Sequence, residues 1–217
     1  MFVKLWMKKD VVTIAPDQTL AEAEALMQEK KIRRLLVTKD QLLVGILTRE
    51  DIQKGIPASC DENTRRIAAQ STVAAHMTQN PITAEPMAPL EDIALTMRRN
   101  KIGGLPVIEN NTLVGIITES DIFMALTEIL GAGKNGARIE MKIGHGPNEL
   151  FQVVKLCKQF AITITAISIY QDFSPEHDLL TVRLDGDNLD DLIDAFWQSG
   201  CRINRIMRFD PEGMADT

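Results

Sequence analysis

Two short stretches of the chain place a glycine, a threonine and an aspartate at the same spacing. The first contains Gly45, Thr48 and Asp51, and the second contains Gly115, Thr118 and Asp121. Each follows an apolar run and precedes a helical pattern, so each predicts a strand, a turn and a helix start. Amides at a helix N-terminus and a threonine hydroxyl suit a phosphate or ribose oxygen. A carboxylate can accept both hydrogen bonds of a ribose diol, so ligand binding is one interpretation of these turns.

The same spacing also suits a purely structural role. Thr48 and Thr118 would be N-caps, and Asp51 and Asp121 would occupy the glutamate position of a capping box. Such a cap stabilises a helix by about 0.5–2 kcal/mol. Spacing alone leaves both interpretations open.

Basic residues cluster where the first helical run of each of these regions ends. Most of them are explained as cations at helix C-termini, which are favourable by ~0.3–1 kcal/mol each. Arg33 and Arg34 differ, because they lie within a β-like run. In an acidic protein they are the best candidates for phosphate contacts.

Other residues with reactive side chains form no recognisable constellation. The cysteines Cys60, Cys157 and Cys201 contain no CxxC pair, and the histidines His76, His145 and His177 are scattered, so we expect no metal site and free thiols. The sequence has no GxSxG, HExxH, P-loop or GxGxxG motif. Gly144-His145-Gly146 predicts only a tight turn. We therefore expect no catalytic residues and no enzyme activity.

Composition limits the class of protein. The 217 residues carry a net charge of −6 and a pI near 5.2, which disfavours nonspecific nucleic-acid binding. The longest apolar runs are strand-sized, far below the ~20 residues that cross a bilayer. Residues 1–10 lack the apolar core of a signal peptide. We expect a cytoplasmic protein with no membrane association.

The two turns belong to an internal duplication. Shifting the sequence by 70 residues aligns Met7–Ile52 with Met77–Ile122 without a gap, and 16 of these 46 positions are identical. Each copy predicts β-α-β-β-α. In the first copy the strands are Val11–Ile14, Ile32–Val37 and Leu42–Leu47; in the second they are Pro81–Thr83, Ile102–Ile108 and Thr112–Ile117. The helical runs start near Leu20, Thr48, Leu90 and Thr118, and Thr19 with Glu22 predicts a capping box.

The remaining segments set the domain boundaries. We expect one repeat at 1–55, a connector with a short helix over Glu62–Ala69 at 56–74, a second repeat at 75–130 and a glycine-rich linker at 131–136. Residues 137–217 predict a ferredoxin-like β-α-β-β-α-β domain. Its strands are Arg138–Ile143, Ile162–Tyr170, Leu179–Leu184 and Arg202–Phe209, and its helices are Pro147–Phe160 and Leu189–Gln198. Apolar residues of these strands favour a second covered sheet face, which dimerisation would supply: Ile162, Ile164, Ala166, Ile169, Val182 and Leu184.

The duplicated unit resembles a tandem cystathionine-β-synthase (CBS) domain pair, also called a Bateman module. The resemblance covers roughly residues 1–130 and includes the Met-Thr-x-x-Pro opening, the Leu-Pro-Val strand and the G-x-x-T-x-x-D turn. Residues 137–217 are similar to an ACT domain, although Asn148 stands where that family usually has glycine. This order of domains resembles the bacterial acetoin-utilisation regulatory proteins. The fold class is therefore α+β, a CBS pair followed by an ACT-type domain.

The resemblance implies adenosine ligands, such as AMP, ADP, ATP, NAD or S-adenosylmethionine, in clefts between the repeats. Carried over, Asp51 and Asp121 would hold ribose hydroxyls, and Thr48 and Thr118 would contact ribose or phosphate. The base would be lined by the edges of the β-runs: Val12, Thr13, Arg34, Leu35 and Leu36 in one cleft, and Ile82, Thr83, Gly104, Leu105 and Pro106 in the other. Because Arg33-Arg34 and Leu36 replace Gly103-Gly104 and Pro106, the two clefts should differ.

These observations predict a homodimeric regulatory or sensor protein without a required cofactor. It would bind an adenine nucleotide and relay binding by domain rearrangement to an enzyme or regulatory partner. Two alternatives remain, a ligand-free interaction scaffold and a regulatory subunit of a metabolic enzyme.

Overall fold

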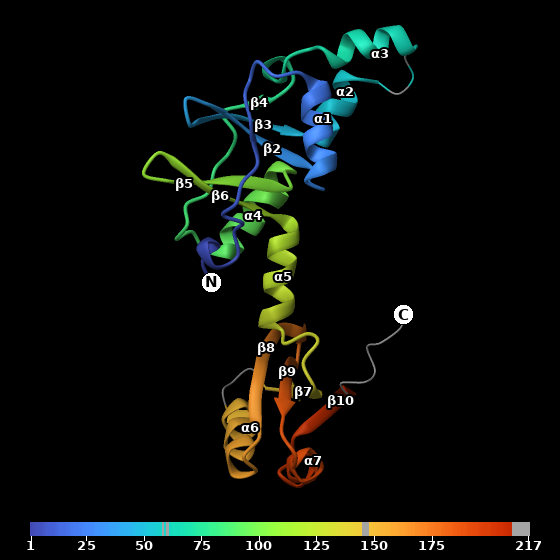
Figure 1. Ribbon diagram of the computed structural model, residues 1–217. Helices are drawn as coiled ribbons and strands as arrows, with labels where there is room; N and C mark the ends of the chain where they lie inside the picture. Colours follow the sequence, from blue (N-terminus) through green and yellow to red (C-terminus); the bar gives the residue numbers. More distant parts are fainter. Residues whose placement is uncertain (58, 60, 145–147, 210–217) are drawn as a thin grey trace. The chain divides into compact units, whose positions relative to one another are not determined.

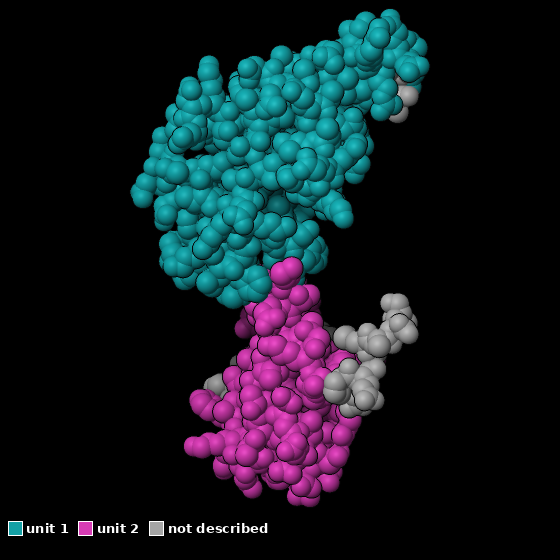
Figure 2. All heavy atoms as spheres, viewed as in Figure 1, with its two compact units in different colours: residues 1–123 teal, residues 124–217 magenta. Residues whose placement is uncertain are grey.

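A computed structural model describes residues 1–57, 59, 61–144 and 148–209. Cys60, His145 and Pro147 lie outside the described residues, and with them the predicted turn at His145. The chain forms two compact units, Met1–Phe123 and Met124–Thr217 (Figure 2). The division falls ahead of the predicted linker at 131–136. Each unit is described by itself below.

Unit 1 contains the two repeats, up to Phe123 of the last helix (Figure 1). The first repeat has the predicted order β-α-β-β-α, and the second has its first strand at Thr78–Gln79 in place of the predicted one. The first comprises η1 (Val3–Leu5), β1 (Thr13–Ile14), α1 (Leu20–Glu29), β2 (Arg34–Lys39), β3 (Leu42–Thr48) and α2 (Arg49–Gly55). After α3 (Glu62–Ala69) come η2 (Val73–Ala75), β4 (Thr78–Gln79), α4 (Leu90–Asn100), β5 (Gly104–Glu109), β6 (Thr112–Thr118) and α5 (Glu119–Ile129). The predicted capping box is present: Thr19 N–H donates to Glu22 Oε2 (2.7 Å), and Glu22 N–H donates to Thr19 Oγ1 (3.2 Å).

The opening segment of each repeat pairs with the other repeat. Lys8 bridges Ile116 of β6, and its counterpart seventy residues later, Thr78, pairs with Ile46 of β3. The same exchange holds further out, where Val3 N–H donates to the carbonyl of Ala88 and Val73 N–H donates to that of Gln18. Val73 is buried in the core of the first repeat, with Leu20 and Leu47. The two repeats are therefore interlocked by pairing segments that lie far apart in the sequence.

One predicted strand is wrong. Pro81–Thr83 forms no strand, and the second repeat has only an isolated bridge there, between Ala84 and Val107. In the first repeat Leu36 N–H donates to the carbonyl of Val12 (3.4 Å). The counterpart of Leu36 is Pro106, which has no N–H to donate, so this ladder bond cannot form.

Two-residue turns join the antiparallel strands within each repeat. Asp40 and Gln41 join β2 to β3 with φ values of +50° and +65°, and Asn110 and Asn111 join β5 to β6 with +49° and +64°. Two positive φ angles define a type I′ turn, whose twist matches that of the flanking strands. These hairpins set the register that brings each threonine to the start of its helix.

Unit 2 has the predicted β-α-β-β-α-β order. It contains β7 (Gly136–Ile143), α6 (Asn148–Gln159), β8 (Thr163–Ser174), β9 (His177–Asp185), α7 (Leu189–Gln198) and β10 (Arg202–Phe209). The strands form one antiparallel sheet in the order β10-β7-β9-β8. Buried residues of α6 and α7, including Val153 and Phe196, pack on Ile139 and Val182 of the sheet. Membership of the ACT family stays a prediction.

Only part of the argument for a second covered sheet face holds. Ile162, Val182 and Leu184 are all buried in the core beneath the two helices. On the opposite face β7 and β9 present Arg138, Glu140, Lys142, Thr181 and Arg183. Ala166, Tyr170 and Leu179 continue the same rows, so this face is mixed polar and apolar, and dimerisation stays a prediction.

Candidate functional site

The Thr48–Asp51 turn is a capping box. Thr48 N–H and Thr48 Oγ1 both donate to Oδ2 of Asp51, at 2.8 and 2.6 Å, and Asp51 N–H donates to Thr48 Oγ1 at 3.2 Å. The structural interpretation of this turn is thus confirmed. It uses one carboxylate oxygen, and no described residue binds Oδ1 of Asp51. Asp51 is half-buried, so a ligand can reach that oxygen while the cap stays intact.

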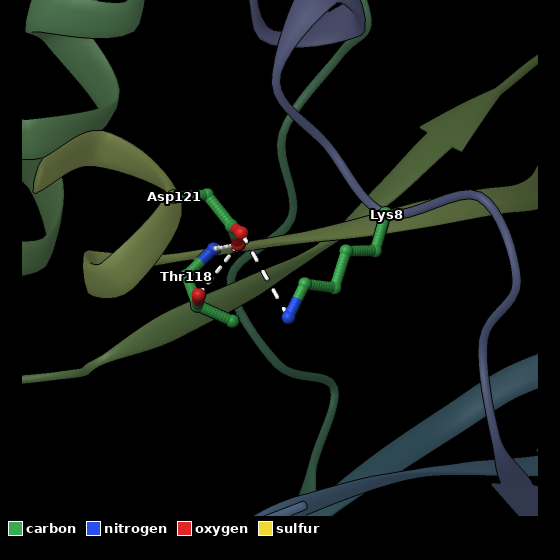
Figure 3. A network of polar contacts seen from close by, with 3 residues as sticks. All are labelled: Lys8, Thr118 and Asp121. Carbon is green, nitrogen blue, oxygen red and sulfur yellow. Dashed lines mark hydrogen bonds and ion pairs between the residues drawn. The ribbon is translucent and has the colours of Figure 1, made fainter. Parts of the chain in front are cut away.

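The second turn shares this geometry but differs in one contact (Figure 3). Thr118 N–H and Oγ1 donate to Oδ2 of Asp121, at 2.8 and 2.5 Å. Here Oδ1 of Asp121 faces the ammonium of Lys8 at 3.9 Å. Asp121 is only 5% exposed, and both of its oxygens therefore already have partners.

Each turn lies beside a cavity built from both repeats. The larger cavity, of about 640 Å³, places the Thr48–Asp51 turn opposite the opening of the second repeat. Ile46 and Ile82 supply apolar surface, and Arg33, Arg34, Arg49 and Lys101 supply positive charge. The remaining lining residues are Glu50, Gln53, Thr78, Asn80, Pro81, Asn100, Ile102, Gly103 and Gly104.

The smaller cavity, of about 260 Å³, is its pseudo-symmetric counterpart. It places Thr118 opposite the opening of the first repeat, and Asp121 is not among its lining residues. Its walls are Lys8, Asp10, Val11, Val12, Lys31, Ile32, Arg33, Arg34, Leu36, Ile116, Thr118 and Ser120. We call these the Asp51 cleft and the Asp121 cleft.

Arg34 lines both clefts but packs against the glycine pair of the second repeat. A Cβ built on Gly103 would collide with Nη2 of Arg34, and one on Gly104 would lie 3.2 Å from its Cδ. Burial lowers the pKa of Arg34, and the nearby Glu119 carboxylate opposes that shift. The absence of side chains at Gly103 and Gly104 thus makes room for one guanidinium from the first repeat. The predicted inequivalence of the clefts has a physical cause here.

Most of the predicted site residues line one or both clefts. Thr48, Asp51, Ile82 and Gly104 line the Asp51 cleft; Val12, Leu36 and Thr118 line the Asp121 cleft; Arg33 and Arg34 line both. Leu35 and Leu105 are instead fully buried, and Pro106 is buried in β5. Thr13 and Thr83 are exposed outside these clefts, Thr83 beside a separate cavity with Ala84 and Ile108.

Sequence reasoning missed Lys8 and Thr78. They precede the first predicted strand of each repeat, and their role depends on the exchange of opening segments between the repeats. The 70-residue alignment does pair Lys8 with Thr78, and that difference in charge was the available signal. Among the described residues, no group of three or more His, Cys, Asp or Glu side chains could hold a metal ion. No helix in the described part of the chain is long and apolar enough to cross a membrane.

Comparison with family models identifies the repeats. The CBS domain model matches residues 3–58 and 73–128. Among curated proteins, a CBS domain-containing protein of Dictyostelium discoideum is 32% identical over 137 residues, which are 60% of this chain and 94% of that protein. The inosine-5'-monophosphate dehydrogenase of Korarchaeum cryptofilum is 27% identical over 165 residues. That match spans 76% of this chain but only 32% of the dehydrogenase.

Solved structures are similar over the same proportion of the chain. The CBS domain pair of protein MJ0100, in complex with 5'-methylthioadenosine and S-adenosyl-L-methionine, is 29% identical with a TM-score of 0.51, over 58% of this chain and 95% of that one. CBSX2 in complex with AMP is 25% identical with a TM-score of 0.51, over 59% and 97%. AcuB from Vibrio cholerae is 28% identical with a TM-score of 0.52, over 60% and 93%.

Proposed function

Because this chain belongs to the CBS-domain family, we propose that unit 1 binds an adenosine-containing nucleotide in the Asp51 cleft. One observation carries the choice of cleft. Oδ1 of Asp51 has no partner among the described residues, and Asp51 lines a cavity of about 640 Å³. A carboxylate with one oxygen held by the backbone and the other open is suited to accept a hydrogen bond from ribose.

The rest of the Asp51 cleft suits the other parts of a nucleotide. Ile46, Pro81 and Ile82 offer apolar surface to a base, and Asn80 offers an amide for its polar edge. Arg33, Arg34 and Lys101 supply the positive charge that a phosphate requires. In a chain of net charge −6 this local excess of cations is notable for anion recognition. The adenosine ligands of the MJ0100 pair and of CBSX2 support the same class of ligand.

The chain would act as a regulatory sensor and not as an enzyme. A nucleotide that binds one arrangement of the repeats more tightly shifts the population toward that arrangement. The change would alter binding to a partner protein or to the second protomer of a homodimer. The partial match to inosine-5'-monophosphate dehydrogenases favours a second candidate, the regulatory part of a metabolic enzyme. Copurification and activity assays separate the two candidates. A regulatory part should copurify with an enzyme and change its activity when the nucleotide is added, whereas an independent sensor should bind the nucleotide without such an enzyme.

The direct test is a binding panel on the full chain. AMP, ADP, ATP, NAD, 5'-methylthioadenosine and S-adenosylmethionine are each titrated by calorimetry and by thermal unfolding. A ligand at 100 times its dissociation constant stabilises the native state by roughly 2.7 kcal/mol. Mass spectrometry of small molecules released on denaturation identifies any ligand carried through purification. No heat, no thermal shift and no released nucleotide would instead favour the ligand-free scaffold.

A further inference from the structure

Two arginines face each other directly on the helix-free side of the sheet in unit 2. Arg138 of β7 and Arg183 of β9 are register partners, and Ala166 of β8 continues the same row. Like charges placed directly opposite each other on neighbouring strands are destabilising. The repulsion between the two guanidinium groups lowers the stability of the sheet unless another interaction offsets it.

Only one of these arginines has a carboxylate. Nη1 of Arg138 lies 2.7 Å from Oε1 of Glu140. Arg183, by contrast, has no acidic partner among the described residues; its Nη1 donates to the carbonyl of Lys134 (3.1 Å), and its guanidinium lies 4.4 Å from the centre of the Phe209 ring. Burial and the charge of Arg138 both lower the pKa of Arg183. The local charge balance is therefore positive.

The pair lines a cavity of about 270 Å³. The segment that precedes β7 packs over this part of the sheet, because a Cβ on Gly131 would lie only 3.0 Å from Cδ of Arg183. Thr181 and Ser168, which are register partners in the next row, add two hydroxyls. The apolar walls are Leu130, Ala132, Ala166 and Ile167.

We propose that this cavity binds a small organic anion through the guanidinium groups of Arg138 and Arg183. Guanidinium forks match the oxygens of a carboxylate or a phosphate, and the hydroxyls of Thr181 and Ser168 can donate to the same group. The apolar walls would hold a short hydrocarbon part. Binding relieves the repulsion between the two arginines, so the anion stabilises unit 2. All lining residues of the site belong to unit 2, so its test is separate from that of the nucleotide cleft in unit 1.

The competing explanation is that Arg183 only fastens the preceding segment to the sheet, through Lys134 and Gly131. With the anion present, both explanations predict that Arg183→Gln lowers the melting temperature. They differ in the dependence on anions. A fastening role gives the same loss in every buffer, whereas an anion site gives a larger loss when the anion is present.

The test titrates the full chain with isobutyrate, succinate and inorganic phosphate, with sodium chloride at equal ionic strength as reference. We expect at least one of the three to bind and to raise the melting temperature beyond the chloride reference; the carboxylate and phosphate arms distinguish the two sources of oxyanion. Arg138→Gln and Thr181→Val should weaken binding by about tenfold or more, as expected for loss of a charge-assisted hydrogen bond. Because Thr181→Val keeps the Arg183 contacts, weaker binding in this variant would not be explained by unfolding of the segment that Arg183 holds.

Lys142→Gln is the matched control. Lys142 lies on the same face of β7 but outside the cavity, and its removal should leave affinity unchanged. Equal weakening by Lys142→Gln and Arg138→Gln would reduce the effect to general surface charge and overturn the proposal. So would the absence of binding by all three anions. Neither result bears on the nucleotide, whose binding is tested with Asp51 variants.

Discussion

The ammonium of Lys8 lies 3.9 Å from Oδ1 of Asp121, whereas the counterpart of Lys8 in the second repeat is Thr78, beside the Asp51 cleft. Lys8 reaches Asp121 because the opening segment of the first repeat pairs with β6 of the second. The same exchange carries Thr78 to β3. One difference between two related positions therefore leaves one aspartate open and the other engaged.

Replacing Lys8 by its counterpart should open the second cleft. In Lys8→Thr, Oδ1 of Asp121 loses its cation and becomes available to a ribose. An ion pair with one exposed partner contributes up to about 1 kcal/mol, so we expect the affinity of the Asp121 cleft to rise by up to roughly fivefold. Calorimetry with AMP should then detect a second binding event per chain. Lys9→Thr, which changes an exposed neighbour outside both clefts, should leave the wild-type stoichiometry.

The reciprocal change should close the first cleft. Thr78→Lys places an ammonium where it can reach Asp51 from the equivalent backbone position, and AMP affinity should fall by a similar factor. If Lys8→Thr and Thr78→Lys both leave the stoichiometry and the affinity of AMP unchanged, positions 8 and 78 do not select the cleft.

The two aspartates should differ in what their loss does. Asp51→Ala removes a capping interaction and the open ribose acceptor, so the free energy of unfolding should fall by about 0.5–2 kcal/mol and nucleotide affinity should fall as well. Asp121→Ala removes an equivalent cap and a carboxylate that is already engaged. Its stability should fall at least as much, with little change in affinity. Urea unfolding measures the stability of both variants, and calorimetry measures their nucleotide affinity. If Asp51→Ala leaves the nucleotide affinity unchanged, Asp51 only caps the helix and does not bind the ligand.

Gly103→Ala tests the position of the Arg34 side chain. The added methyl collides with Nη2 of Arg34, and the guanidinium must move because its long side chain is the flexible part. Affinity for ATP and AMP should fall, since both carry phosphate, and affinity for 5'-methylthioadenosine should change little. An equal loss for all three ligands would mean that the glycine matters for cleft shape and not for phosphate contacts.

Cys157 provides a pH-dependent test of the core of unit 2. Burial raises the pKa of its thiol from about 9 to about 11. The native state therefore favours the neutral thiol, and its contribution to stability should be fully present below pH 9 and lost as the pH rises toward 11. In a Cys60→Ser, Cys201→Ser background, reaction with a thiol reagent should be slow below pH 9 and accelerate with unfolding. Rapid reaction of the native protein at neutral pH would contradict the burial of Cys157.

Much of the local structure was predictable because it depends on short-range chemistry. The capping pairs Thr19–Glu22 and Thr48–Asp51, the type I′ hairpins and the helix Glu62–Ala69 all follow from neighbouring residues. The strand predicted at Pro81–Thr83 is absent because its pairing depends on a residue far away in sequence. Pro106 has no N–H to donate to it. In unit 2, alternation along the strands places Val182 and Leu184 under the helices and leaves Ala166 on the opposite face, which a count of apolar residues does not distinguish.

By itself, the sequence determined the duplication, the β-α-β-β-α order of each copy, the capped turns and the family to which the copies belong. These depend on periodicity and on spacings of a few residues, which survive without knowledge of the fold. Only the tertiary structure decided that each repeat lends its opening segment to the other. That exchange builds each cleft from both repeats, brings Lys8 to Asp121 and leaves Asp51 open. Contacts between residues a hundred positions apart have no signature in local pattern, because they depend on how whole segments pair.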